Sequence, residues 1–123
     1  MENIKKVSVL AYLTIIGFII ALYINKGNKT ELGTYHLKQA LGLHCTSFLL
    51  LFIPFFLIAG VGSDLLGIFS YLMTVILLVI VLGSISIYLI KMYIKAIIIA
   101  YNEEMKPIPA FGNTYEKWFS FIK

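Results

Sequence analysis

The stretch Leu65–Tyr101, "LLGIFSYLMTVILLVIVLGSISIYLIKMYIKAIIIAY", decides the fold class, because it contains no proline and only two charged residues. As a single helix with a rise of about 1.5 Å per residue, this run would reach about 55 Å, well beyond the ~30 Å hydrocarbon core of a bilayer. Two arrangements are open. Either one helix spans at about residues 65–90 and continues to about residue 101, or a break near Gly83–Ser86 creates two spans. That segment has no proline, asparagine or charge, so the single long helix is favoured.

The composition of the whole chain supports a membrane location. Sixty per cent of its 123 residues are apolar or aromatic and 13% are charged, against about 45–50% and about 25% in soluble domains. The mean hydropathy is +0.93. We therefore expect one all-α domain over residues 1–123, a polytopic helical bundle in a bilayer. Every basic residue is lysine, and the absence of arginine argues against specific nucleic-acid recognition.

Two further apolar runs precede the long one, at about residues 7–24 and 41–59. The first is too long for the apolar part of a signal peptide and is expected to be a retained span with a close-packing pair, Gly17 and Ala21. A loop over residues 25–34 follows, with Thr34 as the expected N-cap of the next helix. Pro54 lies inside the second run, and residues 59–64 supply a turn. Three spans are expected, with four as the alternative.

The tail over residues 107–123 is expected to form a short amphipathic helix in the membrane interface, with packing on the bundle as the alternative. With three spans, only Lys5 and Lys6 share a side with the 59–64 turn, whereas the remaining lysines lie on the other side. Lysine-rich segments stay in the cytoplasm. The prediction is a multi-pass protein of the bacterial inner (cytoplasmic) membrane, with a short N-terminus outside and the C-terminal tail cytoplasmic. The expected interfacial anchors are Lys91, Lys95, Tyr115, Trp118 and Phe119.

The stretch Gly33–Ser47, "GTYHLKQALGLHCTS", holds both histidines, the single cysteine and the single glutamine. Helical spacing separates the two histidines by about 12 Å along the axis and turns Cys45 to another face. Because a metal centre needs three or four convergent ligands, and a cysteine nucleophile needs a nearby base, we expect no metal, no cofactor and no catalytic residue. One helix face instead collects four polar residues: His36, Gln39, Thr46 and Ser47.

The long apolar run carries a matching polar stripe that gives way to Lys91 and Lys95. Lysines near a span end extend to the headgroups, and polar side chains inside a bilayer need partners. The two stripes are therefore either satisfied between helices or line a groove that faces the cytoplasm. The residues that this second stripe contributes are Ser70, Thr74, Ser84 and Tyr88.

The helix start "YHLKQAL", after one span and a short loop with lysine and asparagine, resembles a family of small bacterial membrane proteins of unknown function labelled "import component protein". Those proteins are regarded as distantly similar to the Tic-twenty type subunit of the chloroplast inner-envelope import machinery. The resemblance covers roughly residues 12–109 and rests on Tyr35, His36, Gln39 and Ala40. The glycine that this family shows after its last helix has no counterpart in "AYNEE". The resemblance implies a helical membrane bundle with a role in protein import or translocation.

Two functions are therefore open. The first is a non-enzymatic integral membrane subunit, an accessory or assembly component of an inner-membrane complex. Its partners would be the lipid bilayer and other membrane-protein subunits, or further copies of the chain, but no nucleic acid. The second is a small transporter or channel with a polar groove that faces the cytoplasm.

Overall fold

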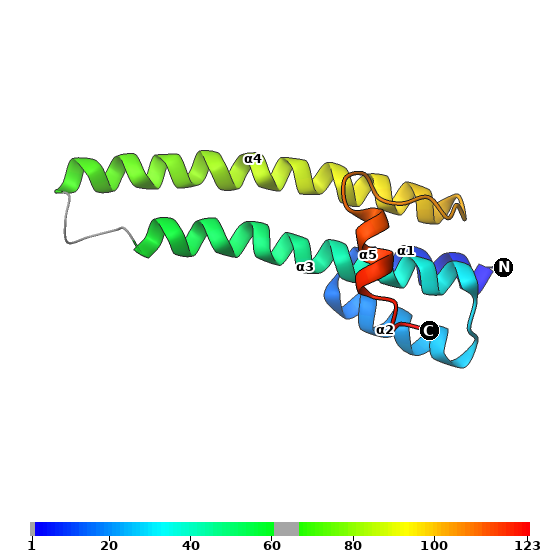
Figure 1. Ribbon diagram of the computed structural model, residues 1–123. Coiled ribbons are helices and arrows are strands. Elements are labelled where there is room, and N and C mark those ends of the chain that lie inside the picture. Colours follow the sequence, from blue (N-terminus) through cyan, green and yellow to red (C-terminus); the bar gives the residue numbers. More distant parts are fainter. Residues whose placement is uncertain (1, 61–66) are drawn as a thin grey trace. The chain divides into compact units, whose positions relative to one another are not determined.

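A computed structural model describes residues 2–60 and 67–123, and within them every regular element is a helix. By contacts the chain forms two units. The first comprises residues up to 45 together with 91–123, and the second comprises residues 46–90. The helices, labelled in Figure 1, are α1 (Glu2–Leu13), α2 (Ile15–Gly27), α3 (Glu31–Gly60), α4 (Ile68–Tyr101) and α5 (Gly112–Trp118).

Two of these helices, α3 and α4, are long and apolar enough to cross a membrane by length and composition. α4 continues without interruption through Gly83–Ser86, so the expectation of a single long helix is confirmed. α3 continues through Pro54. In the most apolar 18-residue stretch of α4, only 6% is buried. In the corresponding stretch of α3, 17% is buried. The core helix of a soluble protein is mostly buried, whereas α3 and α4 are mostly exposed within the described residues.

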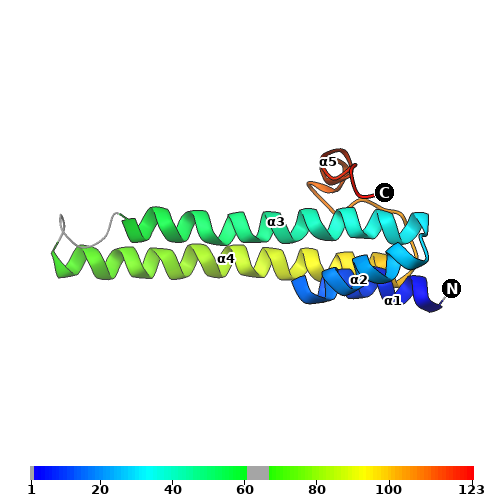
Figure 2. The ribbon, with the colours of Figure 1, turned by 90° about the horizontal axis from the view of Figure 1, so that it is seen from below.

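Residues 7–24 do not form the single span that their hydropathy predicts. The helix stops at Leu13 and starts again at Ile15, and α1 and α2 pack on each other as the hairpin seen in Figures 1 and 2. At the turn, Thr14 has an extended backbone (φ −156°, ψ 167°), and its Oγ1 accepts a hydrogen bond from the Gly17 N–H at 2.9 Å. Threonine caps a new helix in this way. A hydropathy average cannot detect such a one-residue break, which explains the wrong prediction.

The small residues of α2 let the hairpin close. Gly17 and Ala21 are both buried. A Cβ atom on Gly17 would lie 2.5 Å from the carbonyl oxygen of Leu10. The close approach that this pair predicts is therefore observed, and the partner is α1. The buried apolar core of the first unit comprises Val7, Ala11, Tyr12, Phe18, Ala21, Leu37, Ala40, Leu43, Met92, Ala96, Ala100, Ile108 and Tyr115.

The start of α3 lies four residues earlier than the sequence indicates. Thr30, not Thr34, is the N-cap, because its Oγ1 accepts from the Gly33 N–H at 3.1 Å. Thr34 has another role: its hydroxyl accepts from the side-chain amide of Asn25 at 3.1 Å. Asn25 is buried and also accepts from the Thr30 N–H through Oδ1 at 3.5 Å. The end of α2 is thereby joined to the first turn of α3.

The chain leaves α4 through a tight C-terminal turn. The Glu103 N–H donates to the Ala100 carbonyl and the Glu104 N–H donates to the Ile99 carbonyl, both at 3.1 Å. This is the Schellman pattern, in which the residue after the helix adopts a left-handed conformation. Glu103 occupies that position with φ 58°. The turn sends residues 105–111 back along the first unit.

The tail packs on the first unit, so the alternative to an interfacial helix is the one observed. Tyr115 of α5 is 2% exposed and belongs to the core, and Phe119 and Ile122 pack against that core. Figures 1 and 2 show α5 lying beside the N-terminal half of α3. Gly42 of α3 makes this possible, because a Cβ atom there would overlap the ring of Tyr115. Trp118 is 70% exposed and remains available to the surroundings.

Candidate functional site

Three polar side chains of the stretch 33–47 each tie a different segment to α3, and together they form the polar network of the first unit. The first is His36, which is 1% exposed. Its Nδ1 is hydrogen-bonded to the hydroxyl of Tyr12 on α1 at 3.1 Å, and the two rings meet edge to face. Tyr35 approaches the same imidazole with its ring edge, at 5.4 Å between centroids. His36 therefore fixes α1 against α3.

Gln39 holds the tail. Its amide nitrogen donates to the carbonyl oxygen of Gly112 at 2.8 Å, and its amide oxygen accepts from the Ile108 N–H at 3.3 Å. Gln39 is fully buried. A backbone amide or carbonyl that is buried without a partner is destabilising. One side chain thus satisfies two backbone groups of a segment about 70 residues away in the chain.

His44 closes the break in the first hairpin. Its Nε2 lies 3.0 Å from the carbonyl oxygen of Ala11, and its Nδ1 lies 2.8 Å from the hydroxyl of Tyr93 on α4. A carbonyl can only accept, so Nε2 carries the proton, and Nδ1 of the neutral ring accepts from Tyr93. Ala11 belongs to the last turn of α1, where carbonyls have no partner within the helix. His44 supplies that missing donor and also contacts the Phe18 ring edge to face.

Burial sets the electrostatics of this network. It raises the pKa of the Tyr12 hydroxyl well above its ordinary value, and the nearby Tyr35 adds to the shift. Tyr12 therefore keeps its proton throughout the physiological range. Ser8 of α1 is fully buried, and its hydroxyl has no hydrogen-bond partner among the described residues. Nothing in this cluster carries a permanent charge. Its hydrogen bonds hold α1, α4 and the tail against α3.

The remaining residues of the expected polar stripes lie in the second unit. Ser47 is buried and Thr46 is half-buried. On α4, the Thr74 hydroxyl donates to the Ser70 carbonyl and the Ser84 hydroxyl donates to the Ile80 carbonyl, both at 2.8 Å. Hydroxyls bonded to their own helix are satisfied without a neighbour. Tyr88 is 47% exposed.

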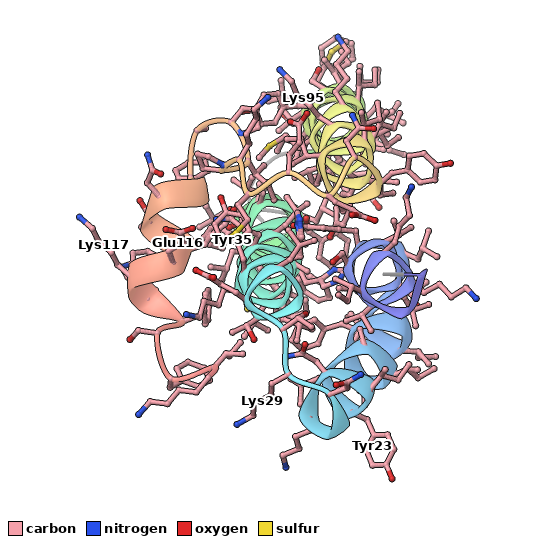
Figure 3. All side chains as sticks on the ribbon, turned by 90° about the vertical axis from the view of Figure 1, so that its right-hand side faces the viewer. Tyr23, Lys29, Tyr35, Lys95, Glu116 and Lys117 are labelled. Atoms are coloured by element: carbon pink, nitrogen blue, oxygen red, sulfur yellow. The ribbon has the colours of Figure 1, made fainter. Side chains whose placement is uncertain are left out.

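Some of the expected interfacial anchors are exposed and others are packed against the core. Lys91 and Lys95 are exposed on α4, as expected, and Figure 3 shows Lys95 on the outer side of that helix. Trp118 is exposed, whereas Tyr115 is a core residue and Phe119 is half-buried against the core. Tyr115 is therefore a packing residue, which corrects its assignment as an anchor.

No metal centre forms within residues 2–60 and 67–123, because no group of three histidine, cysteine or acidic side chains converges there. Cys45 is exposed and unbridged. Neither a family model, nor a curated protein, nor a solved structure matches the chain.

Sequence reasoning identified His36 and Gln39 but missed most contacts of the network. Tyr12 and Tyr93 carry no polar cluster around them, and only the fold brings them to His36 and His44 on α3. Gly42 lies on α3 itself and was not recognised as the contact for Tyr115. The signal for Gly42 was available, since a glycine within an otherwise strong helix pattern has a packing reason. The signal for Thr14 was weaker: a threonine followed three residues later by a glycine in an apolar run.

Proposed function

We propose that this chain is a non-enzymatic integral membrane subunit in which α3 and α4 cross the bilayer and the lysine-bearing segments of the first unit face the cytoplasm. The observation that carries the proposal is the distribution of positive charge. All ten basic residues are lysines that belong to the first unit, and none lies between Lys38 and Lys91. Lysine-rich segments are retained in the cytoplasm. The apolar parts of α3 and α4 that lie between these two lysines have the length and composition of membrane spans.

The hairpin α1–α2 changes the proposed topology at the N-terminus. With 12 and 13 residues, the two helices reach only about 20 Å each, less than the ~30 Å core. The Lys5 ammonium lies 3.9 Å from the ring centroid of Tyr101 at the end of α4. The sequence predicted an N-terminus outside the cell and a tail in the cytoplasm. That topology required residues 7–24 to form one continuous span. We propose instead that both termini are cytoplasmic and that the hairpin enters one leaflet and returns.

The exposed surface of α2 supports this insertion. Ile15, Ile16 and Ile19, near the hairpin turn, are between 61% and 71% exposed. Tyr23, near the charged end, is 80% exposed, and Figure 3 shows it pointing away from the other helices. Apolar residues at the tip and tyrosine with lysine at the base match the depth profile of a leaflet.

Cysteine labelling in inverted and right-side-out membrane vesicles tests the topology. Cys45 is first replaced by serine, and single cysteines are then placed at Lys6, Lys29 and Lys117, which are all exposed. An impermeant maleimide should label all three from the cytoplasmic side only. Labelling at position 6 from the outside would overturn the two-span topology.

The subunit role is supported by the apolar surface of the second unit. A cavity of about 350 Å³ is lined there by Leu51, Phe52, Phe55, Leu82 and Ser86. Phe48 and Phe52 stack at 4.2 Å between ring centroids, with both side chains exposed. In a bilayer, such grooves and aromatic ridges pack against other helices by shape. Protein translocation is the process that the sequence resemblance favours.

Copurification in mild detergent tests the subunit role. The wild-type chain should return in fixed stoichiometry with another membrane protein or with further copies. Ser86→Phe would fill the groove and should abolish that association, whereas Ser84→Phe, on an exposed position nearby, should retain it. A monodisperse wild-type monomer, or equal association of both variants, would contradict the proposal.

A further inference from the structure

One cavity of the first unit lies between the start of α3 and the tail. Its volume is about 870 Å³, and it is lined by the loop before α3, the first two turns of α3, and residues 105–123. This volume lies within the range of small-molecule sites. The polar network described above does not use it: His36, Gln39 and His44 are absent from its lining.

Positive side chains dominate the lining. Lys29, Lys38, Lys117 and Lys123 come from the loop, from α3 and from the tail, and two glutamates, Glu31 and Glu116, accompany them. Among the described residues, none of these four lysines forms an ion pair with a carboxylate. With four lysines against two glutamates (4 − 2), the lining carries a net charge of +2, which favours an anion.

Neutral donors line the same cavity. The hydroxyl of Tyr35 lies at this cavity beside the Glu116 carboxylate, and burial and then this carboxylate raise the pKa of Tyr35. Figure 3 shows Tyr35 and Glu116 together between α3 and α5, with Lys117 projecting from α5 and Lys29 from the loop. Asn113 adds a side-chain amide. Hydroxyl, amide and ammonium donors together are the groups that hold phosphate oxygens.

A second cavity adjoins the first and has a different character. It measures about 260 Å³ and is lined by Leu22, Leu37, Phe121 and Ile122, with Asn25, Lys26 and Lys123 at its polar side. Lys123 lines both cavities. A charged site next to an apolar one matches a ligand with an anionic head and an apolar chain.

We infer that the lysine-lined cavity binds a phosphate-bearing anion. The apolar cavity beside it indicates that this anion is the headgroup of a lipid. The lysines and donors would hold the phosphate, and Leu22, Leu37 and Ile122 would receive the first part of an acyl chain. The inference does not require a protein partner or a particular number of spans.

Lipid retention by the purified full chain in non-ionic detergent tests the inference. The probes are phosphatidylglycerol, phosphatidylcholine, inorganic phosphate and glycerol phosphate at equal concentration, read by native mass spectrometry and by thermal unfolding. The test variant Lys29→Gln/Lys117→Gln removes two cavity lysines. The matched control Lys6→Gln/Lys106→Gln removes the same charge from exposed lysines outside both cavities.

The wild-type chain should retain one phosphatidylglycerol and unfold at a higher temperature with it, but not with phosphatidylcholine. The cavity variant should lose at least about tenfold in affinity, equivalent to about 1.4 kcal/mol, whereas the control variant should bind like the wild type. An equal response to inorganic phosphate would assign the site to free phosphate and overturn the lipid assignment. Equal losses in both variants would overturn the site itself, since net charge alone would then explain binding.

Discussion

The imidazole Nε2 of His44 lies 3.0 Å from the carbonyl oxygen of Ala11, where the first apolar run is interrupted. This contact gives a hydrogen-bond donor to a carbonyl beside the helix break. In a continuous helix this carbonyl would accept from the Ile15 N–H; the break at Thr14 removes that bond, and a side chain 33 residues later replaces it. The stability of the α1–α2 hairpin should therefore depend on a residue that is not part of it.

Replacing His44 with phenylalanine should open the hairpin. The variant keeps an aromatic ring beside Phe18 but leaves the Ala11 carbonyl and the Tyr93 hydroxyl without this partner. We expect a loss of about 1–3 kcal/mol in the free energy of unfolding, the usual cost of an unsatisfied buried polar group. Thermal unfolding in mild detergent measures it. Cys45→Ser, at the exposed neighbouring position, is the control; equal stability of the two variants would show that the contact is dispensable.

Replacing Gly42 with alanine should detach α5. The new methyl group would overlap the ring of Tyr115, so either the ring or the whole tail must move. We expect a destabilisation of about 1–3 kcal/mol from overpacking. The single tryptophan, Trp118, lies in α5, and its fluorescence anisotropy should fall when the tail loosens.

Gly83→Ala is the matched control for this substitution. Gly83 also lies inside a long helix, but a Cβ atom there meets nothing within 4 Å. Alanine should therefore stabilise α4 by up to about 1 kcal/mol through helix propensity, with no change in Trp118 anisotropy. If Gly42→Ala left the stability and the Trp118 anisotropy as Gly83→Ala does, the ring of Tyr115 would not pack on α3 at Gly42.

Sequence reasoning succeeded where local propensity and hydropathy decide the structure, and it failed where contacts between distant residues decide it. The uninterrupted helix through Gly83–Ser86 follows from local propensity and hydropathy, which the sequence displays directly. The break at Thr14 depends on one hydroxyl and on a distant histidine, and neither changes a hydropathy average. Likewise, the amphipathic tail was visible as a pattern, but its apolar face fits both a bilayer and a protein groove. Only Gly42, which removes a side chain opposite Tyr115, decides between them.

Replacing Gln39 with leucine should release the tail from the first unit. Leucine has a similar size but leaves the Gly112 carbonyl and the Ile108 N–H without this partner in a buried site. We expect faster tryptic cleavage after Lys117, which lies in the tail. Ser84→Ala is the control, since its hydroxyl serves only its own helix. Unchanged cleavage in Gln39→Leu would mean that apolar packing alone holds the tail.

The turn after α4 offers a stabilising substitution. Glu103 has φ 58°, the left-handed conformation in which a side chain is strained and glycine is not. Glu103→Gly should therefore raise the free energy of unfolding by up to about 1 kcal/mol. Glu103→Ala removes the same carboxylate but keeps a Cβ atom, so it should gain little. Equilibrium unfolding of the three proteins separates the effects: if alanine and glycine stabilised equally, the gain would come from lost negative charge at the helix C-terminus and not from relief of backbone strain.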